Sequence, residues 1–159
     1  MKLAVLHLYD HNDWANSKLI EFLEAQPAEL LEKTASGSYG SIAETLVHLA
    51  AAQERYVARL TDEKRADEVK EANGWPGFQP LRESLAWSGP RLAALAEVTT
   101  EDASRVIEWR GQPTKLRFAT LLAQVINHAT EHRVNITSIL SAEGVEHPDL
   151  DVWAYPEDE

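Results

Sequence analysis

The segment from Phe118 to Ala142 constrains the fold more than any other part of the chain. It contains no glycine and no proline, and its apolar residues recur every three or four positions, as on one face of an α-helix. The members of this stripe are Leu121, Val125, Ile136 and Ile139. The pattern predicts a long helix over 118–142 that ends before Gly144, a residue type favoured just beyond helix ends.

Two histidines, His128 and His132, fall in the gap of this apolar stripe. Residues four apart on a helix project side by side, so both imidazoles are expected to point toward the protein interior. Such a pair can bind a metal ion, bind a proton together with an anion, or make hydrogen bonds to buried neighbours. Arg133 follows directly and is expected either to pair with an inward carboxylate or to lie on the surface.

Three more helices are predicted on similar grounds. The first covers 2–26, and Pro27 stops it. The second opens with a capping box at Ser41-Ile42-Ala43-Glu44 and runs to about residue 60. The third has Pro80 in its first turn, runs to about residue 98, and is expected to kink or split at Gly89-Pro90. The apolar face predicted for the first helix consists of Val5, Leu8, Ala15, Leu19 and Phe22.

The connections between these helices differ in length. Residues 61–79 form a long, charged connection after the second helix, which is expected to cross over the end of a bundle. Residues 104–118 are expected to form a small β-hairpin or an extended excursion before the fourth helix. With 159 residues, the chain suggests a single domain over 1–159, and the fold class predicted is an all-α four-helix bundle.

Composition narrows the chemistry. The chain has no cysteine, so a metal ion would need His, Asp or Glu ligands, and a thiol would have to come from a small molecule.

A net charge of −11 argues against binding nucleic acid or anionic membranes. The amino-terminal apolar run is interrupted by His7 and stopped by Asp10, which is too short for a signal peptide, so a soluble cytoplasmic protein is expected.

His48 is the best candidate for a third metal ligand. It lies in the middle of the second helix, beside the apolar stripe, and small neighbours, Thr45 and Ala52, leave room around its ring. Three neutral imidazoles suit Zn²⁺, Ni²⁺ or another late first-row ion. A rival pair, His7 and His11, is also spaced four apart, but is interpreted as lying at the flank of the first helix without a metal.

Two carboxylates have open interpretations. Glu131, next to His132, is either a solvated charge or a general base near the metal. Glu54, six residues after His48, is either solvated or an acceptor for an imidazole N–H.

Three blocks of the sequence, taken together, resemble the DinB/YfiT-like family, which is unrelated to the lesion-bypass polymerase that shares the name. They are Tyr9-Asp10-His11-Asn12-Asp13-Trp14-Ala15-Asn16, Gly40-Ser41-Ile42-Ala43-Glu44-Thr45-Leu46-Val47-His48-Leu49 and Asn127-His128-Ala129-Thr130-Glu131-His132-Arg133. Their order and spacing fit over nearly the whole chain. No single block is specific, but the combination is.

The resemblance implies an up-down-down-up bundle, often a homodimer, with a divalent metal ion held by three histidines. These map onto His48, His128 and His132. Relatives include the bacillithiol and mycothiol S-transferases and the maleylpyruvate isomerase group. One departure is Glu131, because that position is often a second histidine in the family. It leaves the three ligands in place and changes the charge near them.

The function expected from these features is a metal-dependent transferase that joins a low-molecular-weight thiol to a small electrophilic substrate. Asn12 and Trp14 are candidates for the pocket wall, and Glu131 for a catalytic role. The alternatives are a metal-dependent hydrolase with Glu131 as base, and a non-catalytic metal-binding stress-response or scaffold protein.

Overall fold

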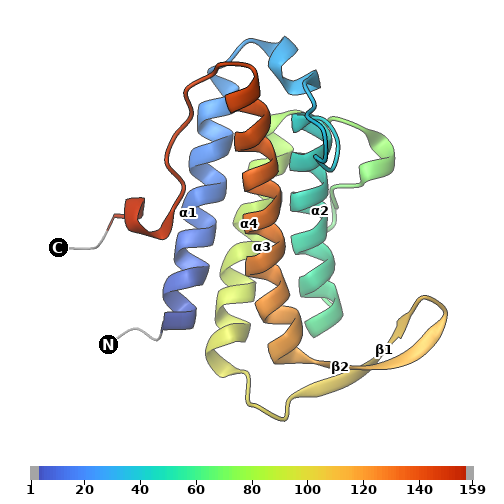
Figure 1. Ribbon diagram of the computed structural model, residues 1–159. Helices are drawn as coiled ribbons and strands as arrows, with labels where there is room; N and C mark the ends of the chain where they lie inside the picture. The colour runs from blue at the N-terminus through green and yellow to red at the C-terminus, as the bar shows by residue number, and fades with distance from the viewer. Residues whose placement is uncertain (1–3, 157–159) are drawn as a thin grey trace.

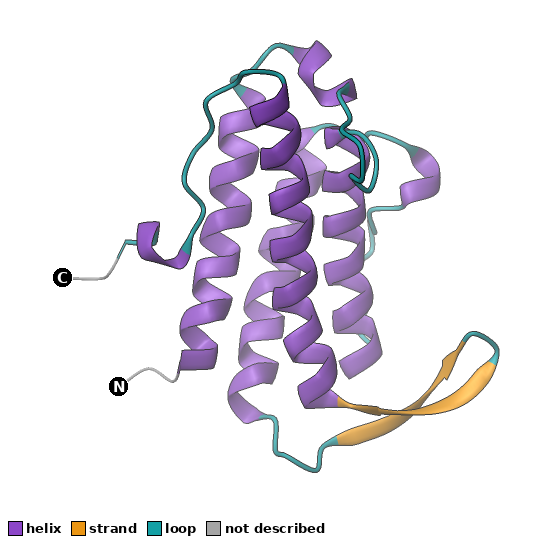
Figure 2. Cartoon of the chain, in the orientation of Figure 1, coloured by secondary structure: helices purple, strands orange, loops and turns teal. Residues whose placement is uncertain are grey.

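The computed structural model describes residues 4–156 and contains four long helices and one small antiparallel sheet (Figure 1). The helices are α1 (Ala4–Glu24), α2 (Ile42–Thr61), α3 (Phe78–Val98) and α4 (Phe118–Ala142). The strands β1 (Ser104–Trp109) and β2 (Gln112–Arg117) form the hairpin between α3 and α4 (Figure 2). Short 3₁₀ turns cover η1 (Ala28–Glu32), η2 (Glu71–Asn73) and η3 (Val152–Ala154). The predicted hairpin is therefore present.

The helices lie side by side, and both α1 and α2 pack against α3 and α4 (Figure 1). The long crossover after α2 carries the chain back along the bundle, so α2 and α3 run in the same direction (Figure 1). The helices α1 and α4 also run in the same direction as each other (Figure 1). The Tyr9 hydroxyl donates a hydrogen bond to the Leu122 carbonyl, and farther along both helices Arg133 donates to Asn16. Within the described residues, no helix is long and apolar enough to cross a membrane.

Local sequence signals set the ends of α2 and α4 as predicted. Ser41 caps α2, and its side chain and that of Glu44 satisfy each other's backbone N–H groups in a capping box. The helix α4 spans the predicted residues, and Gly144 beyond it has a left-handed φ of 72°. Of the two outcomes predicted at Gly89-Pro90, a kink or a split, the split is wrong, because α3 is one helix through both residues. Pro90 lies on the exposed side of a continuous helix, where water can reach the carbonyl that it leaves without a partner.

The predicted apolar face of α1 is confirmed for Ala15 and Leu19, which are buried, and is wrong for Val5 and Leu8. Val5 and Leu8 are 40% and 38% exposed. The helix instead buries a face that mixes apolar and polar side chains, because Arg133 of α4 is buried against it and needs hydrogen-bond acceptors. Residues 2 and 3 of the predicted helix lie outside the described residues. The buried residues of α1 are Tyr9, His11, Asn12, Ala15, Asn16, Leu19, Ile20 and Leu23.

The interior consists of two apolar clusters and a set of buried polar residues in the middle part of the helices. One cluster lies toward the η1 end and includes Leu23, Leu46 and Ile139, and the other lies toward the hairpin end and includes Leu92 and Val125. We call these buried polar residues the polar layer; its members are Asn12, Asn16, Gln53, Ser84, Ser88 and Arg133.

Hydrogen bonds inside the polar layer link different helices. The Arg133 guanidinium is 3% exposed and donates to Asn12 Oδ1 and Asn16 Oδ1, each at 2.7 Å. Ser88 of α3 donates to Gln53 Oε1 of α2 at 3.2 Å. Burial lowers the pKa of Arg133 to about 10, which still leaves it charged at neutral pH. Of its two expected positions, Arg133 occupies the buried one.

Candidate metal centre

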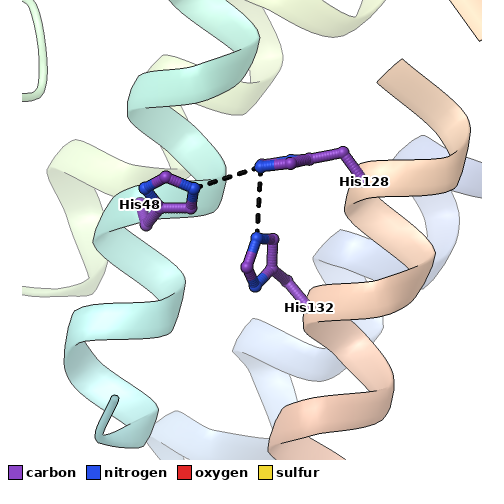
Figure 3. Close-up of side chains that lie close together, drawn as sticks. All are labelled: His48, His128 and His132. Carbon is purple, nitrogen blue, oxygen red and sulfur yellow. Dashed lines mark hydrogen bonds between the residues drawn. The ribbon is translucent and has the colours of Figure 1, made fainter. Parts of the chain in front are cut away.

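Three histidines meet between α2 and α4, next to the polar layer (Figure 3). The Nε2 atom of His128 lies 3.1 Å from Nε2 of His48 and 3.1 Å from Nε2 of His132. One potential ligand nitrogen from each residue lies within 4.8 Å of the other two. The structure thus brings together the three residues that the sequence singled out, from helices 80 residues apart in the chain.

Small neighbours allow this approach. Ala52 lies one turn after His48 on α2, and Ala129 follows His128 on α4, and both alanines are buried. His132 is 7% exposed, and the other two histidines are partly buried. Because His128 and His132 are four residues apart, they lie on the same side of α4, and the ring of His48 on α2 faces them.

Burial and mutual proximity disfavour the charged form of the two α4 histidines. Burial, followed by the neighbouring histidines, lowers the pKa of His128 to about 4. Burial also lowers the pKa of His132, with a further contribution from His48. At neutral pH both rings are therefore uncharged, which is the protonation state that a metal ion requires.

The donor set and its spacing fit a divalent metal ion. Two imidazole nitrogens bound tetrahedrally to Zn²⁺ at about 2.0–2.1 Å lie roughly 3.3 Å apart, close to the observed 3.1 Å. Three imidazoles would leave at least one coordination position for water or a small molecule. The cluster can therefore hold a metal ion as a catalytic site does, with a position to spare.

Aromatic rings surround the cluster. The Tyr39 ring stacks on His48 with centroids 4.1 Å apart, and it meets His132 edge-on at 5.2 Å. Tyr56 meets His128 edge-on at 5.8 Å. Sequence reasoning missed Tyr39, because it lies in the loop before α2 and no periodic pattern connects it to the histidines.

Glu71 is the second residue that sequence reasoning missed. Its Oε2 lies 3.1 Å from Nδ1 of His48, and its Oε1 accepts a hydrogen bond from Arg55 at 2.7 Å. Partial burial alone would raise the pKa of Glu71, but the contacts with His48 and Arg55 lower it below its usual value. The sequence around Glu71 does not predict its contact with His48, because this contact depends on the path that the crossover takes along α2.

Glu54, the carboxylate suggested from sequence as an imidazole partner, does something else. It is 4% exposed, so the expectation of a solvated side chain is wrong. It accepts hydrogen bonds from the backbone N–H of Val69 at 2.9 Å and from Arg65 at 3.3 Å. Its burial has a structural reason, because it anchors the crossover onto α2.

Glu131 is exposed on α4, and its negative charge opposes the lowering of the pKa of His132. Asn12 and Trp14 lie on α1, where the structure gives them other contacts. Asn12 accepts from Arg133, and Trp14 packs against Tyr155 of the carboxy-terminal tail with ring centroids 5.6 Å apart. Among the described contacts, neither touches the three histidines.

The rival pair of histidines lies against the tail. His11 was expected at a partly wet flank, but it is 5% exposed, because the tail covers it and the Leu150 carbonyl lies 2.9 Å from its Nε2. His7 meets the Tyr155 ring edge-on at 5.3 Å. Within residues 4–156, the only cluster of three or more potential ligands is the one formed by His48, His128 and His132.

Comparison with known proteins identifies the family of the chain. The family model described as "DinB family" matches residues 1–159. The chain belongs to the DinB family. Protein DinB of Bacillus subtilis (strain 168) is 22% identical over 157 residues, which cover 93% of this chain and 91% of that protein. The crystal structure of a DinB-like protein from Bacillus cereus ATCC 10987 superposes with a TM-score of 0.59 at 19% identity, covering 86% of this chain and 90% of that one. The DinB fold therefore extends over the helices that carry the histidines.

Proposed function

We propose that His48, His128 and His132 bind one divalent metal ion, with Zn²⁺ or Ni²⁺ as the best candidates, and that the protein is a metal-dependent transferase. The observation that carries the proposal is the convergence of three imidazole nitrogens from two helices. Imidazole ligands favour late first-row ions over Mg²⁺ or Ca²⁺.

The proposed reaction joins a low-molecular-weight thiol to a small electrophile. The thiol sulfur forms a bond to an electrophilic carbon, the leaving group departs with its electron pair, and the thiol proton passes to a base. A bound divalent cation lowers the pKa of a thiol or water at its open position. The absence of cysteine from the chain supports an external thiol as the source of sulfur.

The chain offers space for such a substrate beside the histidines. A cavity of about 560 Å³ is lined by Tyr39, Val47, Glu71 and Trp75. Tyr39 and Glu71 also contact His48, so these two side chains lie between the cavity and the cluster, and none of the three histidines lines the cavity. We assign Glu131 as the candidate proton acceptor, because it is exposed beside His132 and its charge acts on that ring. We further propose that the protein is a homodimer, which a sedimentation measurement tests, and that it is located in the cytoplasm.

Elemental analysis of protein purified without an affinity tag tests the metal site. We expect about one equivalent of a late first-row metal in the wild type, and a loss of it in His48→Ala and His132→Ala. His147→Ala is the matched control, because this histidine contacts Ser141 and Pro148 rather than the cluster. Unchanged metal content in both cluster variants would overturn the assignment.

A second experiment separates the reaction classes. The metal-loaded protein is incubated with bacillithiol, mycothiol, glutathione or cysteine and a generic electrophile, and loss of thiol is followed. Thiol-dependent conversion that His132→Ala abolishes supports the transferase. Conversion of ester or amide substrates without a thiol would instead favour the hydrolase. Metal binding with neither activity would favour a non-catalytic binding protein.

A further inference from the structure

The crossover between α2 and α3 brings one carboxylate to the outer nitrogen of a proposed metal ligand. Glu71 lies in η2, and its Oε2 is 3.1 Å from Nδ1 of His48. The other ring nitrogen, Nε2, faces His128. The contact is an ion-pair distance rather than an aligned hydrogen bond. A carboxylate this close to Nδ1 still favours the tautomer that carries its proton on Nδ1, and the lone pair of that tautomer lies on Nε2 and is directed into the cluster.

The Glu71 carboxylate is itself held in place from two directions. Arg55, two turns after His48 on α2, donates to Oε1 at 2.7 Å, and the Tyr39 hydroxyl donates to Oε2 at 3.1 Å. Tyr39 also stacks its ring on His48. One imidazole is therefore fixed at its edge by the crossover and on its face by the loop before α2.

The crossover that carries Glu71 is anchored independently of the histidines. The buried carboxylate of Glu54 accepts from the Val69 backbone two residues before Glu71, and it also accepts from Arg65. Arg65 in turn donates to the Asp67 carbonyl at 2.6 Å. These contacts fix the height of the crossover on α2, so the position of Glu71 is built into the fold before any metal ion binds.

We propose that Glu71 is a positioning residue of the metal centre, which orients His48 and fixes its tautomer so that Nε2 is free to bind the ion. This inference rests on the proposed metal site and adds a residue to it. It also gives the crossover a role, because a change in its path would alter metal affinity without touching a ligand. Carboxylates in this position typically contribute roughly 10- to 100-fold to metal affinity.

The test compares Glu71→Ala with Glu63→Ala, which removes the same charge from the same crossover. Glu63 is exposed and pairs with Arg91 of α3, away from the histidines. Zn²⁺ affinity is measured by competition with a chromophoric chelator. We expect Glu71→Ala to bind roughly 10- to 100-fold more weakly than the wild type, and Glu63→Ala to match the wild type within about twofold. Equal affinities in the two variants would overturn the proposal.

A measurement on the metal-free protein tests the role of Glu71 independently of metal binding. The ¹⁵N chemical shifts of the His48 ring in the metal-free protein report which nitrogen carries the proton. We expect a protonated Nδ1 in the wild type and a mixture of tautomers in Glu71→Ala, with Glu71→Gln in between because its amide oxygen still accepts. An identical His48 tautomer in wild type and Glu71→Ala would overturn the positioning role. If the wild type bound no Zn²⁺, the proposed function would fail while the ring nitrogens still decided the role of Glu71.

Discussion

The carboxylate of Asp13 on α1 lies directly against the backbone of Gly89 on α3. A Cβ atom added to Gly89 would lie 2.3 Å from Oδ1 and 2.4 Å from Oδ2 of Asp13. The two helices approach closely here because one residue has no side chain and the other has a short one. Asp13 has little room to withdraw, since it is also largely buried and lies close to Arg133.

Gly89→Ala should therefore be destabilising, although alanine has the higher helix propensity. We expect a loss of about 1–3 kcal/mol in the free energy of unfolding, as for other overpacked cores, measured by urea denaturation. Because the nearest atoms all belong to Asp13, combining Gly89→Ala with Asp13→Ala should cost less than the sum of the single changes. Full additivity would contradict a clash between these residues.

The pH dependence of stability should change in Asp13→Asn. Burial raises the pKa of the Asp13 carboxyl from 3.8 to about 6, although Arg133 opposes the change. A raised pKa in the folded state contributes stability that is fully present below pH 3.8 and is lost as the pH rises through about 6. At 1.36 kcal/mol for each pH unit, the loss is roughly 3 kcal/mol.

Asparagine cannot ionise, so this loss should be absent from the variant. The difference in the free energy of unfolding between Asp13→Asn and the wild type should move in favour of the variant between pH 4 and pH 7. Urea denaturation at several pH values measures it. A difference that stays constant over this range would show that Asp13 keeps an ordinary pKa.

Removing the charge of Arg133 should weaken the bundle through its hydrogen bonds. Arg133→Met keeps an aliphatic side chain but leaves Asn12 Oδ1 and Asn16 Oδ1 without their donor. We expect a loss of about 3 kcal/mol in the free energy of unfolding, because the two buried amide oxygens would then have a hydrogen bond neither from Arg133 nor from water. Arg117→Met, at an exposed residue just before α4, should change it by less than about 0.5 kcal/mol. Equal stability of the two variants would contradict this account.

The capping box of α2 should contribute measurably to stability. Ser41 Oγ accepts from the Glu44 backbone N–H, and Glu44 Oε2 accepts from the Ser41 N–H. Ser41→Ala removes half of this arrangement and should cost about 1 kcal/mol in thermal or urea unfolding. Ser36→Ala, in the exposed loop before α2, is the control and should be neutral. A neutral Ser41→Ala would mean that packing alone sets the start of α2.

Sequence reasoning predicted the elements whose signals are local. The bounds of α4 follow from a long run without glycine or proline, and the start of α2 follows from its capping box. The three histidines could be selected because helical spacing and small neighbours are visible in the sequence. The buried face of α1 was predicted only in part. Asn12 was a candidate for a pocket wall, but nothing in the sequence places Asn16 beside it against Arg133 of α4.

The residues around the histidines could not be predicted from the sequence, because they also depend on tertiary contacts. Glu71 and Tyr39 reach His48 through a crossover and a loop, and the path of such segments depends on tertiary contacts. Glu54 illustrates the same difficulty. A carboxylate on a helix usually faces water, but here it is buried because it binds the Val69 backbone, which returns along α2.

The polar layer also determines how the helices are aligned along their length. Sliding α4 against α1 by one helical turn, about 5.4 Å, would leave apolar surface buried but would remove Arg133 from Asn12 and Asn16. The apolar clusters tolerate such a shift far better than the guanidinium does, because hydrophobic contact is not directional. Longitudinal alignment is thus decided by polar contacts and cohesion by apolar ones. Apolar residues at either end could therefore be exchanged while Arg133 holds α4, and with it His128 and His132, at the same height on α1.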